Sequence, residues 1–545
     1  MTVRVTEPAK GSAVGVLVPA APPSAARKVR KAPLVWVGLL AAGLWTYHVF
    51  SAVMISPDSA LFIEYAQRLG AEPIQALRAY DQHPLFPALM LFLRQVCGQF
   101  WSEGAAGWIL AGRLAGLAGY IGILLAAYAL GTRAYDRRIG VITALLAALL
   151  PDLSHLAADV LSDTPHLALY LAGLAALATG LESERRARWL LGSAAASALA
   201  FLTRPEGGAV LVIGLVFVAL RRDWRLQRRL TLGLSMLAVF AAISAPYQVA
   251  TGRFVKKKPL PQLLQFGLGD EQAALDLRKP QHSDAAEPRP VAYAGLDRRG
   301  ALIPINVLYE CGRALRVVYA IPVLIGLAFA RPRRQPGRIL AAAFALHAFL
   351  LCALQSSYGY LDRRHTLVLA ALAMPLAAAG LVYLAQRIRP QANFGFQLAA
   401  IIGLCVLLTG PWLLRPVNRG HEHVRAAARW FSENTPPDAF LVGNRRLHRV
   451  ALCADRAFAE WPWYQGRVPE LVEFLASYAR PNTYLAIDTL LMTTPPRPAT
   501  FMEDLHSMLG SQLDLAFSVA AAPGEAPTEI KIYEYRSVPR ADGFP

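Results

Sequence analysis

Apolar residues fall along this chain in long blocks, and most of the charged residues lie in short segments between them. Crossing the hydrocarbon layer of a bilayer takes about 20 apolar residues. A spanning segment must be helical, because lipid offers no partner for free backbone groups. The pattern therefore predicts a polytopic α-helical membrane protein with eleven spanning helices. We place them near 34–55, 105–130, 139–151, 160–181, 189–203, 206–220, 230–250, 315–330, 339–356, 366–385 and 395–414.

Two longer segments between these blocks have patterns of their own. In 56–104, Leu61, Tyr65 and Leu69 recur at every fourth position, which predicts an amphipathic helix lying in the membrane interface. The stretch "HPLFPALMLFL" predicts a second, half-buried helix packed at the outer surface. The segment 251–314 is polar and contains several prolines, which predicts a large outer loop.

The tail, 416–545, alternates between helical and strand patterns. "EHVRAAARWFSENTPPDAFLVG" predicts a helix, a proline turn and a strand at 440–442, and "PNTYLAIDTLLM" and "EIKIYEYRS" predict two further strands. A length of about 130 residues is enough for a separate hydrophobic core. The alternation predicts a small α/β domain outside the membrane.

Composition supports a membrane protein. The 545 residues are 55% hydrophobic and 17% charged, with a mean hydropathy of +0.35, whereas a soluble chain is about 45–50% apolar and about 25% charged. The net charge of +18 raises the possibility of a nucleic-acid partner. The basic residues lie at the ends of the apolar blocks, without the basic and aromatic surface pattern of nucleic-acid binding. We therefore expect membrane lipids as partners and no nucleic acid.

The distribution of Lys and Arg predicts the orientation. If the N-terminus is cytoplasmic, the six inside segments hold 23 Lys and Arg in 73 residues, as the positive-inside rule requires. "RRDWRLQRR" and "RPRRQPGR" are two of these segments. Residues 1–33 are rich in Ala, Pro and basic residues and are predicted to be a disordered cytoplasmic terminus. The predicted location is the inner (plasma) membrane, with the C-terminal domain extracytoplasmic.

Candidate chemistry lies at the predicted outer ends of the spans. The sequence contains no P-loop, GxSxG, HExxH or dinucleotide motif, but ionisable residues near membrane depth are functional candidates. Asp58, in "SPDSAL", is either a helix cap or a functional carboxylate. Asp163, in "SDTPHL", has the same two interpretations, and Asp159 is a further carboxylate four residues earlier. Two carboxylates facing one cavity can act as a base and its orienting partner.

Basic residues accompany these carboxylates. Arg204 and Glu206, in "TRPEGG", lie at a break between two apolar helices and form either an ion-paired turn or part of a site. Lys256 and Lys257 lie on the predicted outer side, against the positive-inside trend. They either contact anionic lipid or clamp a phosphate-bearing ligand.

A pair of arginines precedes a late span. Arg363 and Arg364, in "YLDRRHT", are followed by His365. Guanidinium groups bind phosphate oxygens bidentately, so the pair suits a phosphate or diphosphate. The alternative is that both side chains snorkel to the interface.

The ordered set of these segments resembles the GT-C fold glycosyltransferases of the family 39 and 83 type. This group includes protein O-mannosyltransferases and the lipid A aminoarabinose transferase. The resemblance covers roughly 34–415. It is carried by "SPDSALFIEYAQRL", "HPLFPALMLFL", "PDLSHLAADVLSDTPHLALYL", "ALAFLTRPEGGAVLV" and "YGYLDRRHTLVLAALAMPLAAAGL".

The resemblance implies roles for particular residues. Asp58 matches the family's catalytic base and Asp163 matches an assisting aspartate. Many members have a second acid immediately after the first aspartate, but this chain has Ser59, so a divalent metal is possible but not indicated. It also implies a contact with the donor phosphate for Arg363 or Arg364, and a structural or substrate-positioning role for His83. From the residues themselves we add, as candidates for donor phosphate binding, Arg204, Lys256 and Lys257, and as candidates for substrate positioning, Tyr65, Glu206, His365 and Tyr358.

The implied reaction is an inverting transfer of a hexose or pentose from a polyprenyl-phosphate donor. The acceptor is a hydroxyl of a protein, lipid or glycan on the outer face, and the lipid-linked sugar is the co-substrate. One alternative is a secondary transporter or lipid flippase, although such proteins use midplane charges and often an internal repeat, which this sequence lacks. A second alternative is a non-catalytic partner in envelope-polysaccharide assembly.

Overall fold

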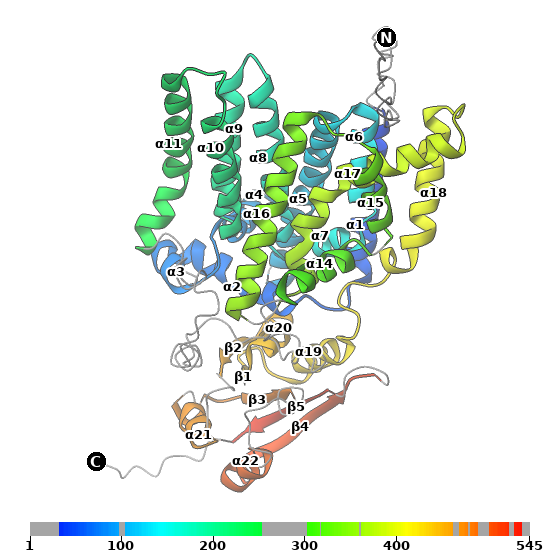
Figure 1. Cartoon of the computed structure of the whole chain (residues 1–545). Coiled ribbons are helices and arrows are strands. Elements are labelled where there is room, and N and C mark those ends of the chain that lie inside the picture. Colours follow the sequence, from blue (N-terminus) through cyan, green and yellow to red (C-terminus); the bar gives the residue numbers. More distant parts are fainter. Residues whose placement is uncertain are drawn as a thin grey trace, which may run out of the picture.

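The protein is a helical bundle with a small sheet at one end, as its computed structural model shows (Figure 1). The structure describes residues 32–97, 104–252, 302–316, 318–358, 361–461, 468–477, 480–488, 501–522 and 528–536. The bundle helices are α1 (Ala32–Ser51), α2 (Pro57–Ala71), α3 (Pro73–Ala79), α4 (Leu85–Cys97), α5 (Ala105–Ala134), α6 (Arg137–Ala148), α7 (Pro151–Ala158), α8 (Asp163–Glu182), α9 (Arg186–Phe201), α10 (Ala209–Ala219), α11 (Leu226–Thr251), α14 (Ile303–Ala314), α15 (Ala320–Phe329), α16 (Arg334–Tyr358), α17 (Leu367–Ile388) and α18 (Phe394–Leu413). Two 3-10 turns, η3 (Pro205–Gly208) and η6 (Arg363–Thr366), precede α10 and α17.

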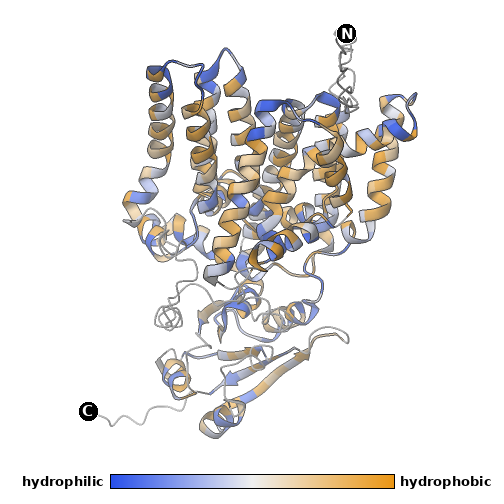
Figure 2. Ribbon diagram, in the orientation of Figure 1, coloured by the Kyte–Doolittle hydropathy of each residue, from blue (hydrophilic) through white to orange (hydrophobic). Residues whose placement is uncertain are grey.

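The protein is a multi-pass membrane protein, as the sequence predicts. Among the described residues, seven helices are long and apolar enough to cross a membrane, and the bent pair α6 and α7 makes an eighth if counted as one span. Apolar residues fill the middle of the bundle and polar ones gather at its ends (Figure 2). Each of the eleven predicted ranges contains a helix, but α15 has only 10 residues and α10 only 11. The count of eleven spans stays a prediction.

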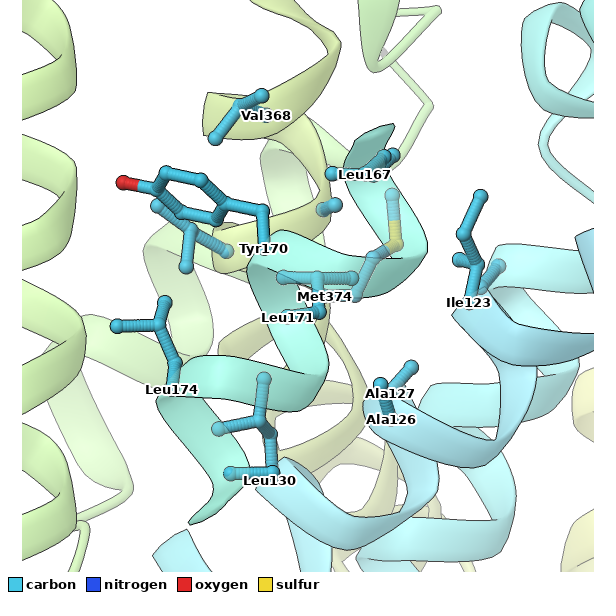
Figure 3. Packing of buried hydrophobic residues seen from close by; sticks show 14 of the residues in the cluster. Ile123, Ala126, Ala127, Leu130, Leu167, Tyr170, Leu171, Leu174, Val368 and Met374 are labelled. Carbon is cyan, nitrogen blue, oxygen red and sulfur yellow. The ribbon is translucent and has the colours of Figure 1, made fainter. Parts of the chain in front are cut away.

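The centre of the bundle is the packing of α5 against α8 and α17. Figure 3 shows Ile123 and Leu130 of α5 facing Leu167 and Leu171 of α8 in the buried hydrophobic core. Glycine makes this approach possible. A Cβ atom on Gly119 would lie 2.5 Å from the backbone nitrogen of Pro165. The segment that begins α8 therefore rests directly on the backbone of α5.

The predicted span 139–151 is instead broken. Helix α6 ends at Ala148 and α7 begins at Pro151, with a bend of 59° between them. A break inside a bundle frees backbone carbonyls that need partners. Two tyrosines supply them: the Tyr120 hydroxyl donates to Ala148 O at 2.5 Å and the Tyr319 hydroxyl donates to Leu149 O at 3.3 Å.

The first loop is helical, as predicted, but its amphipathic helix buries a different face. In α2 the buried side chains include Phe62, Ile63 and Ala66, whereas of the predicted stripe only Tyr65 is buried. The reason is that α2 packs against protein, including α4 and α5. The stripe at every fourth residue therefore does not mark the face that packs on protein, and the interfacial position of the helix stays a prediction.

The C-terminal domain is a five-stranded sheet of order β2-β1-β3-β5-β4 with helices on both faces. Its elements are α19 (Glu422–Asn434), β1 (Phe440–Gly443), η7 (Arg445–Leu447), α20 (His448–Cys453), β2 (Ala457–Glu460), α21 (Val468–Ser477), β3 (Thr483–Asp488), α22 (Phe501–Leu509), β4 (Leu513–Ala520) and β5 (Glu529–Tyr535). Strand β1 pairs in parallel with β2 and β3, and β5 runs antiparallel to β3 and β4. The three predicted strands are β1, β3 and β5, which are largely buried. The two missed strands, β2 and β4, form the sheet edges.

Candidate functional site

A small cavity lined by both apolar and ionisable side chains lies near the end of the bundle that faces the C-terminal sheet. It is walled by leucines from α7, α8, α16 and α17, among them Leu153, Leu167 and Leu351. Seven ionisable side chains also line it: Asp163, His166, Arg204, Glu206, His347, Arg364 and His365. Six of them come together because η3 and η6, with the first turn of α8, lie at the same end of neighbouring helices, and His347 reaches the cavity from α16.

Charges of alternating sign run from the cavity mouth inward. The Arg364 guanidinium forms an ion pair with Asp58, with 2.8 Å between Nη2 and Oδ2. Deeper in the cavity, Arg204 forms an ion pair with Asp163, and its Nε lies 3.8 Å from Glu206 Oε2. Isolated charges at membrane depth are unfavourable, so the alternation is what allows this many ionised groups to share one cavity.

Asp58 is not the cap of its helix. The N-cap of α2 is Ser56, and Asp58 is the second residue of the helix, after Pro57. Its half-exposed carboxylate is bound by Arg364. Burial opposes ionisation of Asp58, but the charge and hydrogen bond of Arg364, with a further contribution from Arg445, hold its pKa below the usual value. Asp58 is therefore an ionised carboxylate at neutral pH.

Asp163 is likewise inside its helix. Ser162 is the N-cap of α8, and Asp163 is the first helical residue. Its side chain is buried and is held by Arg204. Removing one partner of a buried pair leaves the other charge uncompensated, so Asp163 and Arg204 depend on each other.

Asp159 has a separate role from the one considered in the sequence. It does not line the cavity. Its Oδ1 accepts hydrogen bonds from Ser59 Oγ at 2.9 Å and from the Ser56 backbone nitrogen at 3.3 Å. Asp159 therefore binds the beginning of α2, and Ser59, which stands where the resembling family often has an acid, is one of its partners.

The two adjacent arginines diverge. Arg364 contacts Asp58, whereas Arg363 Nε lies 3.0 Å from Asp152 Oδ2. Asp152, in the first turn of α7, also accepts a hydrogen bond from Arg316 at 2.5 Å. Arg363 thus belongs to a second ionic cluster, of Asp152, Arg316 and Arg363. The sequence contained a signal for this cluster, because "LLPDLSHL" places Asp152 at the end of an apolar block.

Other predicted site residues lie apart from the cavity. His83 is buried, with its ring centroid 5.1 Å from that of Phe201 and 5.2 Å from that of Tyr247. Tyr65 is fully buried and stacks on Tyr80 at 4.5 Å. Lys256 and Lys257, and the side chain of Tyr358, lie outside the described residues.

The sequence reasoning missed two histidines of the cavity, His166 and His347. The Nδ1 atom of His166 lies 3.2 Å from Thr203 Oγ1, and His347 comes from the middle of α16. An ionisable residue within an apolar helix was the available signal. Within the described part of the chain, no group of three or more His, Cys, Asp or Glu residues is arranged to hold a metal ion.

Comparison with known proteins supports the fold. Residues 85–247, from α4 to α11, match the family described as dolichyl-phosphate-mannose-protein mannosyltransferase. The structure is similar to that of ArnT from Cupriavidus metallidurans bound to undecaprenyl phosphate, with a TM-score of 0.60 and 15% sequence identity over 92% of this chain and 98% of that one. No curated protein sequence matches this chain.

A second similar structure is the oligosaccharyltransferase AglB from Archaeoglobus fulgidus in complex with an inhibitory peptide and a dolichol-phosphate. Its TM-score is 0.52 at 14% identity, over 85% of this chain and 69% of that one. The predicted fold class is confirmed: the chain has the GT-C fold of membrane glycosyltransferases, with a small C-terminal sheet domain.

Proposed function

We propose that this GT-C protein is an inverting glycosyltransferase that moves a sugar from a polyprenyl-phosphate donor to an acceptor hydroxyl at the extracytoplasmic face. The observation that carries the proposal is the pair formed by Asp58 and Arg364 at the mouth of a charge-lined cavity. A carboxylate beside a guanidinium offers a proton acceptor and an anion-binding group within one contact. Sugar transfer from a phosphodiester needs both.

Asp58 acts as the base in this mechanism. The acceptor oxygen forms a bond with the anomeric carbon while its proton passes to the Asp58 carboxylate. The bond between the anomeric carbon and the phosphate oxygen breaks, and its electron pair leaves with the polyprenyl phosphate. Attack from the side opposite the leaving group inverts the anomeric centre. Asp58 is suited to the role because it is ionised and its side chain is 40% exposed.

Arg364 stabilises the leaving group. The phosphate gains one negative charge as the glycosidic bond breaks, and a cation fixed in position beforehand lowers the energy of that transition state. Asp163 and Arg204 line the same cavity and fix its deeper charges. Arg363 does not line the cavity and pairs with Asp152, and Arg204 is paired with the buried Asp163. Arg364 lines the cavity and contacts the base Asp58, so it is the arginine we assign to the donor phosphate.

The lipid donor accounts for the position of the cavity. ArnT was solved with undecaprenyl phosphate and AglB with a dolichol-phosphate, which supports a polyprenyl carrier for this chain. A carrier of this kind keeps its prenyl tail in the bilayer, so its phosphate can reach only a site near the membrane surface. The sugar, whether hexose or pentose, and the acceptor stay open within the proposal.

The test uses the purified full chain in liposomes with a set of synthetic undecaprenyl-phosphate hexoses and pentoses. We expect at least one donor to release undecaprenyl phosphate, measured by mass spectrometry, when a cell-envelope extract supplies acceptors. Asp58→Asn should abolish this release. A transporter or flippase would move the donor without releasing undecaprenyl phosphate, so transport without release, or full release by Asp58→Asn, would refute the proposal.

A further inference from the structure

The short connection from α1 to α2, residues 52–56, is bound by the C-terminal domain. Just after the last span, Asn418 donates through Nδ2 to Met54 O at 2.8 Å and to Asp159 Oδ2 at 3.0 Å. Its backbone φ is +53°, a conformation that few residue types other than Gly, Asn and Asp adopt readily. A single amide therefore joins the connection to the carboxylate that binds the start of α2.

The next residue of the connection is held by a buried arginine. Arg449, the second residue of α20, is 3% exposed and donates through Nη1 to Ile55 O at 3.0 Å. Its other nitrogens bind Arg446 O at 3.1 Å and His421 Nδ1 at 2.9 Å. The rigid guanidinium fork can reach three acceptors in different directions, which a lysine cannot do.

The connection is also part of the domain's own core. The side chain of Met54 is buried in the hydrophobic cluster formed by α19, α20 and the sheet. Helix α20 and the turn η7 both pack against α2, and α20 lies beside α2 where the sheet domain meets the bundle (Figure 1). The start of α2 is thus held between the bundle, through Asp159, and the C-terminal domain.

We propose that Asn418 and Arg449 are positioning residues that hold the start of α2, so that Asp58 faces Arg364. Asp58 follows the connection by two residues, and the fixed carbonyls of Met54 and Ile55 determine the direction in which α2 begins. The C-terminal domain is then a functional part of the active site, although it supplies no reacting group. This inference rests on the proposed glycosyltransferase function.

The test compares matched pairs of variants within one domain. Asn418→Gly removes the amide, and glycine tolerates the positive φ. Its control is Asn482→Gly, at φ +63°, where the amide binds Asp438 and not the connection. Arg449→Ala is paired with Arg456→Ala, whose guanidinium also binds backbone carbonyls. Arg449→Lys tests for partial rescue.

We expect Asn418→Gly and Arg449→Ala to lower kcat roughly 10- to 100-fold, because a displacement of about 1 Å has effects of this size. KM for the donor should change less than about twofold, since the donor binds in the cavity. Arg449→Lys should recover part of kcat, and both controls should stay near wild type. If Arg449→Ala does not fold, Asn418→Gly and its control decide the question.

Two results would overturn the inference: an unchanged kcat in Asn418→Gly, or an equal fall in the test and control variants. Failure of the proposed function is recognised separately, because Asp58→Asn would then keep full transfer activity. Inactive Asp58→Asn together with active Asn418→Gly refutes only the positioning role.

Discussion

Asp58 and Asp163 begin their helices with nearly the same local sequence and end up in opposite surroundings. "SPDSAL" and "SDTPHL" each place an aspartate in the first turn after a serine N-cap, with a proline within two residues of it. The side chain of Asp58 is 40% exposed and meets one arginine, whereas that of Asp163 is 9% exposed and is fixed to Arg204. The local sequence determines the position of a carboxylate within its helix. The packing of that helix decides whether the carboxylate can exchange protons with a substrate.

The difference in exposure gives the two carboxylates different roles. An accessible carboxylate can accept a proton from an incoming hydroxyl. A buried carboxylate bound to an arginine holds the shape and charge of the cavity. Substitutions at the two residues should therefore affect activity and stability differently.

Asp58→Asn should lower kcat by roughly a thousandfold, within the range expected for loss of a general base. The amide keeps the shape of the side chain but cannot take up the proton. Because Asp58 is half-exposed, the midpoint of thermal unfolding should stay close to wild type. Rates of undecaprenyl phosphate release and thermal unfolding in detergent measure the two quantities. A large fall in stability would contradict the comparison.

Asp163→Asn should destabilise the protein as well as inactivate it. Arg204 would keep its charge in a mostly buried position with only Glu206, 3.8 Å away, as a partner, so the cost should be at most the roughly 3 kcal/mol of an unpaired buried charge. The double variant Asp163→Asn, Arg204→Gln removes this cation but leaves Glu206 without its arginine, so it should recover stability only in part and recover no activity. If Asp163→Asn unfolds at the wild-type temperature, Asp163 does not stabilise the cavity, and the contrast drawn with Asp58 fails.

Arg364→Gln should shift the pH dependence of kcat/KM. The Arg364 charge holds the pKa of Asp58 below its usual value, and the base works only when ionised. Activity is therefore present above the pKa of Asp58 and is lost as the pH falls through it. Without Arg364 that pKa rises, so the acidic limb moves to higher pH. An unmoved limb would exclude Asp58 as the titrating base.

Arg363→Gln should have the smallest effect, a decrease in kcat of a few-fold. Arg363 contacts Asp152, which keeps Arg316 as a partner. The adjacent Arg364→Gln is its matched control, because the same substitution one position along removes the contact with Asp58. If Arg363→Gln impairs transfer more than Arg364→Gln, donor binding belongs to the cluster around Asp152.

The fold was largely predictable because apolar blocks and strand patterns are local signals. The cavity was predictable in part: Asp163, Arg204, Glu206, Arg364 and His365 were candidates and all line it. The separation of Arg363 from Arg364 was not predictable, since it depends on Asp152 lying about 210 positions earlier in the chain. The buried face of α2 was wrong for the same reason, because it is set by packing against helices that are distant in the sequence.

The break between α6 and α7 bears on whether protons can leak across the membrane through the protein. Residues 141–150 are all buried, and their single polar side chain, Thr143, donates to its own helix. The freed carbonyls are bound by tyrosine hydroxyls, so no water is needed at the break. This stretch of α6 and the break after it therefore offer no charged side chain and no unbonded polar group along which a proton could pass. We expect liposomes containing the protein to hold a proton gradient as well as empty ones do.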